Sequence, residues 1–124
     1  VNQLVKQCPN DLGPLYLGLK LSLLTTRKVT YHNFRKLAIA KGMPAHIVEL
    51  LDFAFDLLNH DRKEAMARIT DFESEFPQYQ YYATALRYIS LDFIADDEIR
   101  IKRAKKTLLD SLEHFCTLEL KMNK

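Results

Sequence analysis

A chain of 124 residues, 48% of them hydrophobic, is the right size for one domain with a substantial core. Three glycines and four prolines are too few for the many tight turns of a β-sandwich or β-barrel. The most apolar stretch, residues 15–24, is interrupted by Lys20 and is shorter than the ~20 apolar residues that span a bilayer. It also lacks a small-residue cleavage site, so we expect neither a membrane span nor a retained signal peptide.

The cysteines and the charge distribution indicate where the protein works and what it meets. Cys8 and Cys116 lie near opposite ends of the chain in no metal-type spacing, which favours free thiols and a cytoplasmic location. Residues 1–42 carry seven basic and one acidic side chain, residues 43–99 carry four and twelve, and residues 100–124 carry seven and three. Two basic ends therefore flank an acidic middle, which indicates either neutralisation within the fold or a charged surface for a partner.

The first expected element is a leucine-rich run. Residues 1–10 before it have no clear period and are expected to be irregular. Leucine occupies every second position from 15 to 23, which is a strand period, but every second one of these leucines also forms a helical stripe. The helix propensity of leucine and the placement of Pro14 in a first turn favour a helix. The alternative is a two-stranded ribbon with residues 28–34.

Two further helices are predicted in the first half of the chain. The second spans residues 30–41, with Thr30 as N-cap and Gly42 at the position after the helix where a positive φ is needed. The third spans residues 43–58 and opens with Pro44 in its first turn. The apolar stripe of this third helix comprises Ile47, Leu50, Leu51, Ala54 and Leu58.

Three more helices complete the expected fold. Asp61 and Glu64 form a capping box for the fourth helix, and Asp96 or Asp97 caps the sixth. The core row of the fourth helix is Ala65, Ile69, Phe72 and Phe76. That of the fifth helix is Tyr82, Leu86, Ile89 and Phe93. That of the sixth helix is Ile101, Ala104, Leu108, Leu112 and Phe115. Short connections make successive helices antiparallel. The sequence therefore predicts an all-α single domain over residues 1–124, with five or six helices arranged as helical hairpins or as an irregular bundle.

One segment has the spacing of a repeated helix pair. Its matching residues are Leu50, Phe53, Ala54 and Leu57 in the first helix, and Ala65, Ile69 and Pro77 in the second helix and its stop. Residues 50–77 thus resemble one tetratricopeptide-type repeat, and a second hairpin over residues 82–112 would extend the pattern. Three features depart from that pattern: a turn one residue short, no glycine in the turn, and Phe72 where a small residue is usual. The resemblance implies a helical-hairpin scaffold that binds other proteins.

A second segment has the small, glycine and apolar positions of a DNA-reading motif. The residues at those positions are Ala38, Gly42, Met43, Val48 and Leu51. Residues 35–51 thus resemble a helix-turn-helix, but the would-be recognition helix carries Glu49, Asp52 and Asp56 and no lysine or arginine. Phosphate binding needs cations, and base reading favours arginine, lysine, asparagine and glutamine. We therefore interpret the segment as a structural corner and disfavour nucleic acid as a partner.

The sequence contains no motif of a known catalytic or metal site. It has no HExxH, phosphate-binding glycine loop, nucleophile elbow or CxxC pattern. The histidines, His32, His46, His60 and His114, fall in four different expected elements or connections, and none has a second histidine at helical spacing. We therefore predict no catalytic residues, no metal site and no cofactor. A small enzyme or metal protein is the third-ranked interpretation.

The candidate partner-binding residues lie on the third helix and at the start of the fifth. Glu49, Asp52 and Asp56 fall outside the apolar stripe of the third helix, so we expect an outward acidic strip that meets a basic partner. Tyr79 and Tyr81 are candidate anchors beside the strip, because exposed tyrosines are enriched at interfaces.

A basic cluster supports the competing function. It consists of Arg100, Lys102, Arg103, Lys105 and Lys106, which wrap around more than half of the last helix. The favoured interpretation is a protein-binding module, such as a small adaptor, a chaperone or an immunity-type inhibitor. The alternative is a nucleic-acid-binding regulator that uses the basic cluster.

Overall fold

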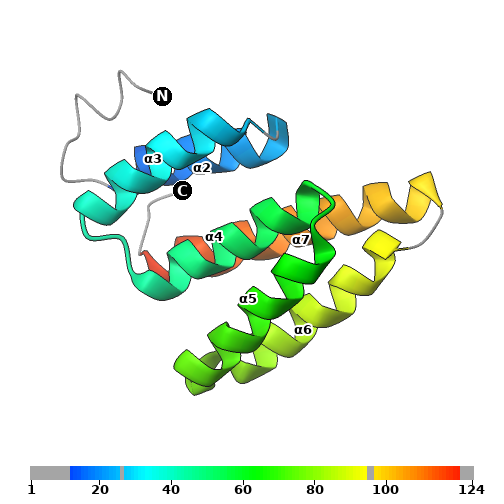
Figure 1. The fold of residues 1–124 in the computed structure, drawn as a ribbon. Helices are drawn as coiled ribbons and strands as arrows, with labels where there is room; N and C mark the ends of the chain where they lie inside the picture. Colours follow the sequence, from blue (N-terminus) through cyan, green and yellow to red (C-terminus); the bar gives the residue numbers. More distant parts are fainter. Residues whose placement is uncertain (1–11, 26, 95–96, 121–124) are drawn as a thin grey trace.

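The computed structural model describes residues 12–25, 27–94 and 97–120, which fold into six α-helices and two short 3₁₀ helices without a strand (Figure 1). The elements are α2 (Leu12–Thr25), α3 (Lys28–Ala40), α4 (Ala45–Leu58), α5 (Arg62–Glu75), η1 (Pro77–Tyr79), α6 (Gln80–Leu91), η2 (Asp92–Ile94) and α7 (Glu98–Glu119). The predicted all-α fold class is confirmed. Cys8, Asp96 and the expected irregular segment at residues 1–10 lie outside the described residues.

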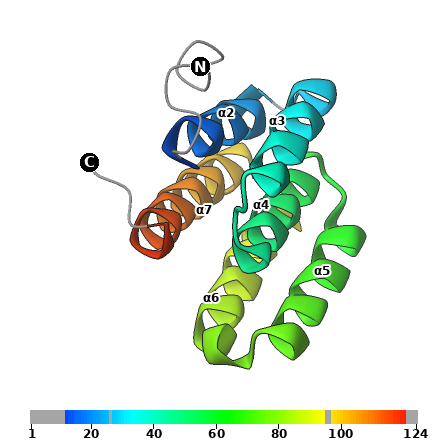
Figure 2. The same ribbon diagram turned by 90° about the vertical axis from the view of Figure 1, so that its left-hand side faces the viewer.

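The helices stack in three layers of two, with successive helices running in opposite directions (Figures 1 and 2). The α2–α3 hairpin forms one outer layer, α4 and α7 form the middle layer, and the α5–α6 hairpin forms the other outer layer. The centre of the stack is α4, in which ten of fourteen residues are buried. It carries apolar residues around most of its circumference, as a helix surrounded by other helices requires.

The ambiguous leucine run is the helix α2, so the alternative of a ribbon with residues 28–34 is wrong. Pro14 lies in its first turn, where the missing backbone N–H removes no helical hydrogen bond. A glycine inside a helix costs about 1 kcal/mol relative to alanine, yet Gly18 has a packing reason. A Cβ at this position would lie 2.6 Å from the ring of Phe34 on α3, so glycine lets the two helices approach closely.

The helix ends follow the predicted signals with two exceptions. α4 begins at Ala45 and Pro44 is its N-cap residue, so Pro44 precedes the first turn in which it was predicted to lie. α3 begins at Lys28, so Thr30 lies inside its first turn and the predicted N-cap at Thr30 is wrong. Gly42 adopts a φ of 88°, as predicted for the residue after a helix. Asp61 and Asp97 cap α5 and α7 as predicted, because each side chain accepts a hydrogen bond from a backbone N–H of the first turn.

The predicted core rows face the interior. The fully buried members are Ala65, Ile69, Phe72, Leu86, Ala104, Leu108 and Leu112, and the partly buried members are Phe76, Tyr82, Ile89, Phe93, Ile101 and Phe115. Cys116 is a buried free thiol, as expected, and its burial raises the pKa of the thiol to about 12. Of the described helices, none combines the length and the apolarity needed to cross a bilayer.

Candidate functional site

Asp52, the centre of the expected acidic strip, points into the protein. The residue is 6% exposed, and its carboxylate accepts a hydrogen bond of 2.7 Å from the Tyr31 hydroxyl. Arg35 Nε lies 3.0 and 3.1 Å from the two carboxylate oxygens, and Arg68 approaches from α5 at 3.7 Å. The prediction of an outward Asp52 is wrong, because α3 and α5 pack on either side of α4 and each brings an arginine to this carboxylate.

The other two members of the strip are also engaged inside the protein. Arg68 Nε donates a hydrogen bond to Asp56, while burial raises the pKa of the Asp56 carboxyl and Arg68 opposes the rise. Glu49 is partly buried and hydrogen-bonded to Glu75 of α5. Burial and the neighbouring negative charges raise the pKa of Glu49 to about 7. The three residues therefore do not form a strip of free negative charges.

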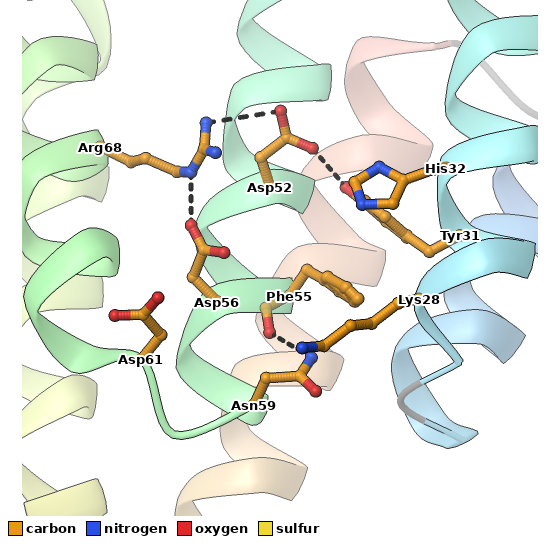
Figure 3. A pocket seen from close by; sticks show the side chains of 9 residues that line it. All are labelled: Lys28, Tyr31, His32, Asp52, Phe55, Asp56, Asn59, Asp61 and Arg68. Atoms are coloured by element: carbon orange, nitrogen blue, oxygen red, sulfur yellow. Dashed lines mark hydrogen bonds and ion pairs between the residues drawn. The ribbon is translucent and has the colours of Figure 1, made fainter.

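A pocket of about 250 Å³ opens beside this network, between α3, α4 and α5 (Figure 3). It is lined by Lys28, Tyr31, His32, Asp52, Phe55, Asp56, Asn59, Asp61 and Arg68. The Asp52 and Asp56 carboxylates both turn toward the Arg68 guanidinium, and Asp61 is engaged in capping α5 (Figure 3). Asp52 and Asp56 would have to leave an ion pair before either could act as a general base, so their arrangement best fits a structural contact between three helices. Among the described residues, no three histidine, cysteine or acidic side chains come together in a way that could hold a metal ion.

The two candidate tyrosine anchors have different environments. The Tyr79 hydroxyl donates a hydrogen bond to Glu119, and its ring stacks on His46 at a centroid distance of 4.9 Å. His46 Nε2 lies 2.9 Å from the same Glu119 carboxylate, so Tyr79 helps to join η1, α4 and α7. Tyr81 is 89% exposed on α6 and is open to a partner.

The basic cluster divides into engaged and exposed members. Arg100 is ion-paired with Asp92 at 2.8 Å, and Lys105 is partly buried. Lys102, Arg103 and Lys106 are exposed, and at about 100° per residue they lie on one side of α7, within about 100° of one another. The proposed DNA-reading helix is α4, whose central position leaves little of its surface open to a nucleic acid.

Sequence reasoning missed a row of exposed leucines on α2. Leu17, Leu21 and Leu24 are 37%, 43% and 54% exposed, and their spacing of four and three places them on one side of the helix. We call these three residues the leucine stripe. The opposite side of α2 buries Leu15, Leu19 and Leu23. The signal was present in the sequence, because a helix with leucine at nearly every second position is apolar on both sides.

The α2–α3 hairpin that carries the leucine stripe is rich in cations. No acidic residue occurs between residues 12 and 42. The cations Arg27, Lys28, Lys36 and Lys41 are exposed, and no described acidic side chain pairs with any of them. A small pocket of about 200 Å³ on α3 is lined by Thr30, Asn33, Phe34 and the exposed Leu37. It borders α2, since Phe34 lies against Gly18.

Comparison with known proteins adds no relative: no family model, no curated protein and no solved structure matches this chain. The resemblance of residues 50–77, which contain most of α4 and all of α5, to a tetratricopeptide-type repeat therefore stays a prediction.

Proposed function

We propose that the protein is a protein-binding module and that the leucine stripe of α2 is its binding surface. One observation carries the proposal: α2 has leucines on two opposite sides, yet one of these sides is open to solvent. Fully burying an exposed leucine contributes about 1.5–3 kcal/mol, and roughly half of that is available from each of these three because they are 37–54% exposed. Contiguous apolar patches on soluble proteins commonly mark interaction sites.

The charges of the α2–α3 hairpin favour an acidic partner. The α2–α3 hairpin offers four exposed cations and no acidic residue, so a partner with acidic residues around an apolar ridge is complementary to it. Two copies packed stripe to stripe would bring cations against cations, which disfavours that dimer. An acidic partner replaces the basic partner expected from Glu49, Asp52 and Asp56, because these residues are engaged within the fold.

An adaptor, a chaperone and an immunity-type inhibitor all act by this kind of non-covalent capture, and the proposal keeps the cytoplasmic location that free thiols favour. The nucleic-acid alternative has less support. Only three members of the basic cluster, Lys102, Arg103 and Lys106, are exposed without a described ion pair, and the neighbouring segment of residues 43–99 carries an excess of acidic side chains.

Site-specific crosslinking tests the proposed function. A photoreactive phenylalanine analogue at Leu21 should form discrete adducts with partner protein in a lysate of the source cell. The same analogue at Ile99, an exposed position on α7, is the matched control and should form few. Leu17→Glu with Leu24→Glu should abolish the Leu21 adducts and change the free energy of unfolding by less than about 1 kcal/mol, since both side chains are exposed. Equal adducts from Leu21 and Ile99 would contradict the proposal.

A further inference from the structure

The outer layer on the other side of α4 has a groove of its own. It lies between α5 and α6 and has a volume of about 290 Å³. Its apolar wall includes Tyr88 and Leu91 of α6, which are 69% and 47% exposed, and Met66 of α5, which is partly buried. The leucine stripe belongs to the opposite outer layer, so the two surfaces are separate (Figures 1 and 2).

Two arginines line this groove, and only one of them is engaged. Arg87 Nε donates to Glu73, and another of its nitrogens donates to Thr70 at 2.8 Å. Arg62 has a buried Nε–H that meets no hydrogen-bond acceptor among the described residues. Burying an N–H without an acceptor is unfavourable, so the Arg62 guanidinium is a donor that a ligand can satisfy.

We propose that this groove binds a segment of a second partner protein that presents a carboxylate beside an apolar side chain. The carboxylate pairs with the guanidinium of Arg62, which lines the groove. The apolar side chain packs against Tyr88 and Leu91. Tyrosine and arginine are the residue types that carry most binding energy at protein interfaces.

The size and charge of the groove select this occupant over two others. Small-molecule sites usually measure about 300–1,000 Å³, so a groove of about 290 Å³ is at the lower limit and has room for one or two side chains. A nucleic acid needs several cations, whereas the groove is lined by two, Arg62 and Arg87, and Arg87 is already engaged with Glu73. The proposal does not depend on the leucine stripe. If both surfaces bind, the protein can hold two partners on opposite sides of α4.

Selection from a library of random 12-residue peptides displayed on phage, with the full chain as bait, tests the groove. The enriched peptides should place aspartate or glutamate next to an aromatic or aliphatic residue. In fluorescence anisotropy, Arg62→Gln and, separately, Tyr88→Ala should each weaken such a peptide by about tenfold or more. Replacing the peptide carboxylate by its amide should weaken binding to the parent protein equally and add nothing further in the Arg62→Gln variant.

Matched controls separate this site from the leucine stripe and from folding defects. Lys63→Gln, a neutralisation of the next, exposed residue, should leave the peptide affinity unchanged. Leu21→Glu should also leave it unchanged, although it should remove crosslinks at the stripe. The groove proposal is overturned if no peptide is enriched, if the enriched peptides lack acidic residues, or if Arg62→Gln binds them as tightly as the parent. Loss of binding in Leu21→Glu alone would assign the peptides to the stripe and likewise overturn it.

Discussion

The α2–α3 and α5–α6 hairpins pack against opposite sides of α4, but their outer surfaces differ in kind. α2–α3 contains no acidic residue and exposes leucines on the side away from the core. α5 places most of its charged residues outward, α6 exposes Tyr81, Tyr88 and Leu91, and the Arg87–Glu73 ion pair joins the two helices. Both hairpins bury an apolar row against the middle layer, so their inner faces follow the same packing rule. The outer faces distinguish them, because α2–α3 combines exposed leucines with cations alone, whereas α5–α6 combines exposed aromatic residues with charges of both signs.

The two hairpins also share one buried carboxylate. Asp52 of α4 meets Arg35 from α3 on one side and Arg68 from α5 on the other. The contact with Arg35 is the closer, since its nitrogens lie 2.9 to 3.1 Å from the carboxylate oxygens, against 3.7 Å for Arg68. We therefore expect Asp52 to contribute more to the attachment of α3 to α4 than to the attachment of α5.

The largest expected effect contrasts an inner with an outer position. Phe72→Ala on α5 should lower the free energy of unfolding by about 3–5 kcal/mol, because the ring is 1% exposed and its removal leaves a cavity. Leu21→Ala on α2 should lower it by less than about 1 kcal/mol, since that side chain is partly exposed and its row faces solvent. Urea unfolding followed by circular dichroism measures both values. A loss below about 1 kcal/mol for Phe72→Ala would mean that α5 is misplaced on α4.

A smaller effect tests the shared carboxylate. Asp52→Ala should cost about 2–3 kcal/mol, because it leaves the Tyr31 hydroxyl and the Arg35 guanidinium without their acceptor, while Arg68 keeps Asp56. This figure lies below that for a fully buried ion pair, since the Arg35 and Arg68 side chains are partly exposed and solvent screens them. The measurement is again the free energy of unfolding in urea.

Double-mutant cycles then separate the two hairpins. Arg35→Met and Arg68→Met, each combined with Asp52→Ala, give the coupling energy between Asp52 and each arginine. The coupling with Arg35 should be the larger. Equal couplings, or a larger one with Arg68, would show that the shorter contacts to α3 do not make α3 the more dependent hairpin.

Features that depend on neighbouring residues were predictable from the sequence. The caps at Asp61 and Asp97 and the positive φ of Gly42 follow from local chemistry, and the core rows follow from helical period. The environments of Asp52 and Tyr79 were not predictable in this way. Their partners, Arg35 and Glu119, lie 17 and 40 residues away along the chain. The period of one helix shows which residues share a face but not which faces another helix will cover.

The leucine stripe was predictable only in part. The alternation of leucines was visible in the sequence, but it was used to decide between a helix and a strand and not to ask which leucines would be exposed. Once α2 is a helix, its leucines cannot all face one core, because positions 15, 19 and 23 lie opposite positions 17, 21 and 24. An apolar outer face therefore follows from sequence and helical geometry together, whereas the absence of a described element covering it follows from the structure alone.

The smallest expected effect concerns the boundary between α4 and α5, where Glu49 meets Glu75. Burial and the charges of Glu75, Asp71 and Asp52 raise the pKa of Glu49 from its ordinary value near 4.5 to about 7. Between these values the folded protein holds a proton that the unfolded chain releases, so stability falls as the pH rises through this window. Glu49→Gln should remove that dependence and stabilise the protein at pH 8 by about 0.5 kcal/mol, a modest gain because the pair is partly exposed.

The pair of carboxyl groups is tested by urea unfolding of the parent protein and Glu49→Gln at pH 5 and pH 8. The parent should lose more stability between the two pH values than the variant does. Asp110→Asn, which removes an exposed carboxyl on α7, is the matched control and should follow the parent. If Glu49→Gln retains the full loss, the Glu49–Glu75 contact does not control it. The α5–α6 hairpin would then be held to α4 by its apolar row and by Arg68, without a proton shared at this boundary.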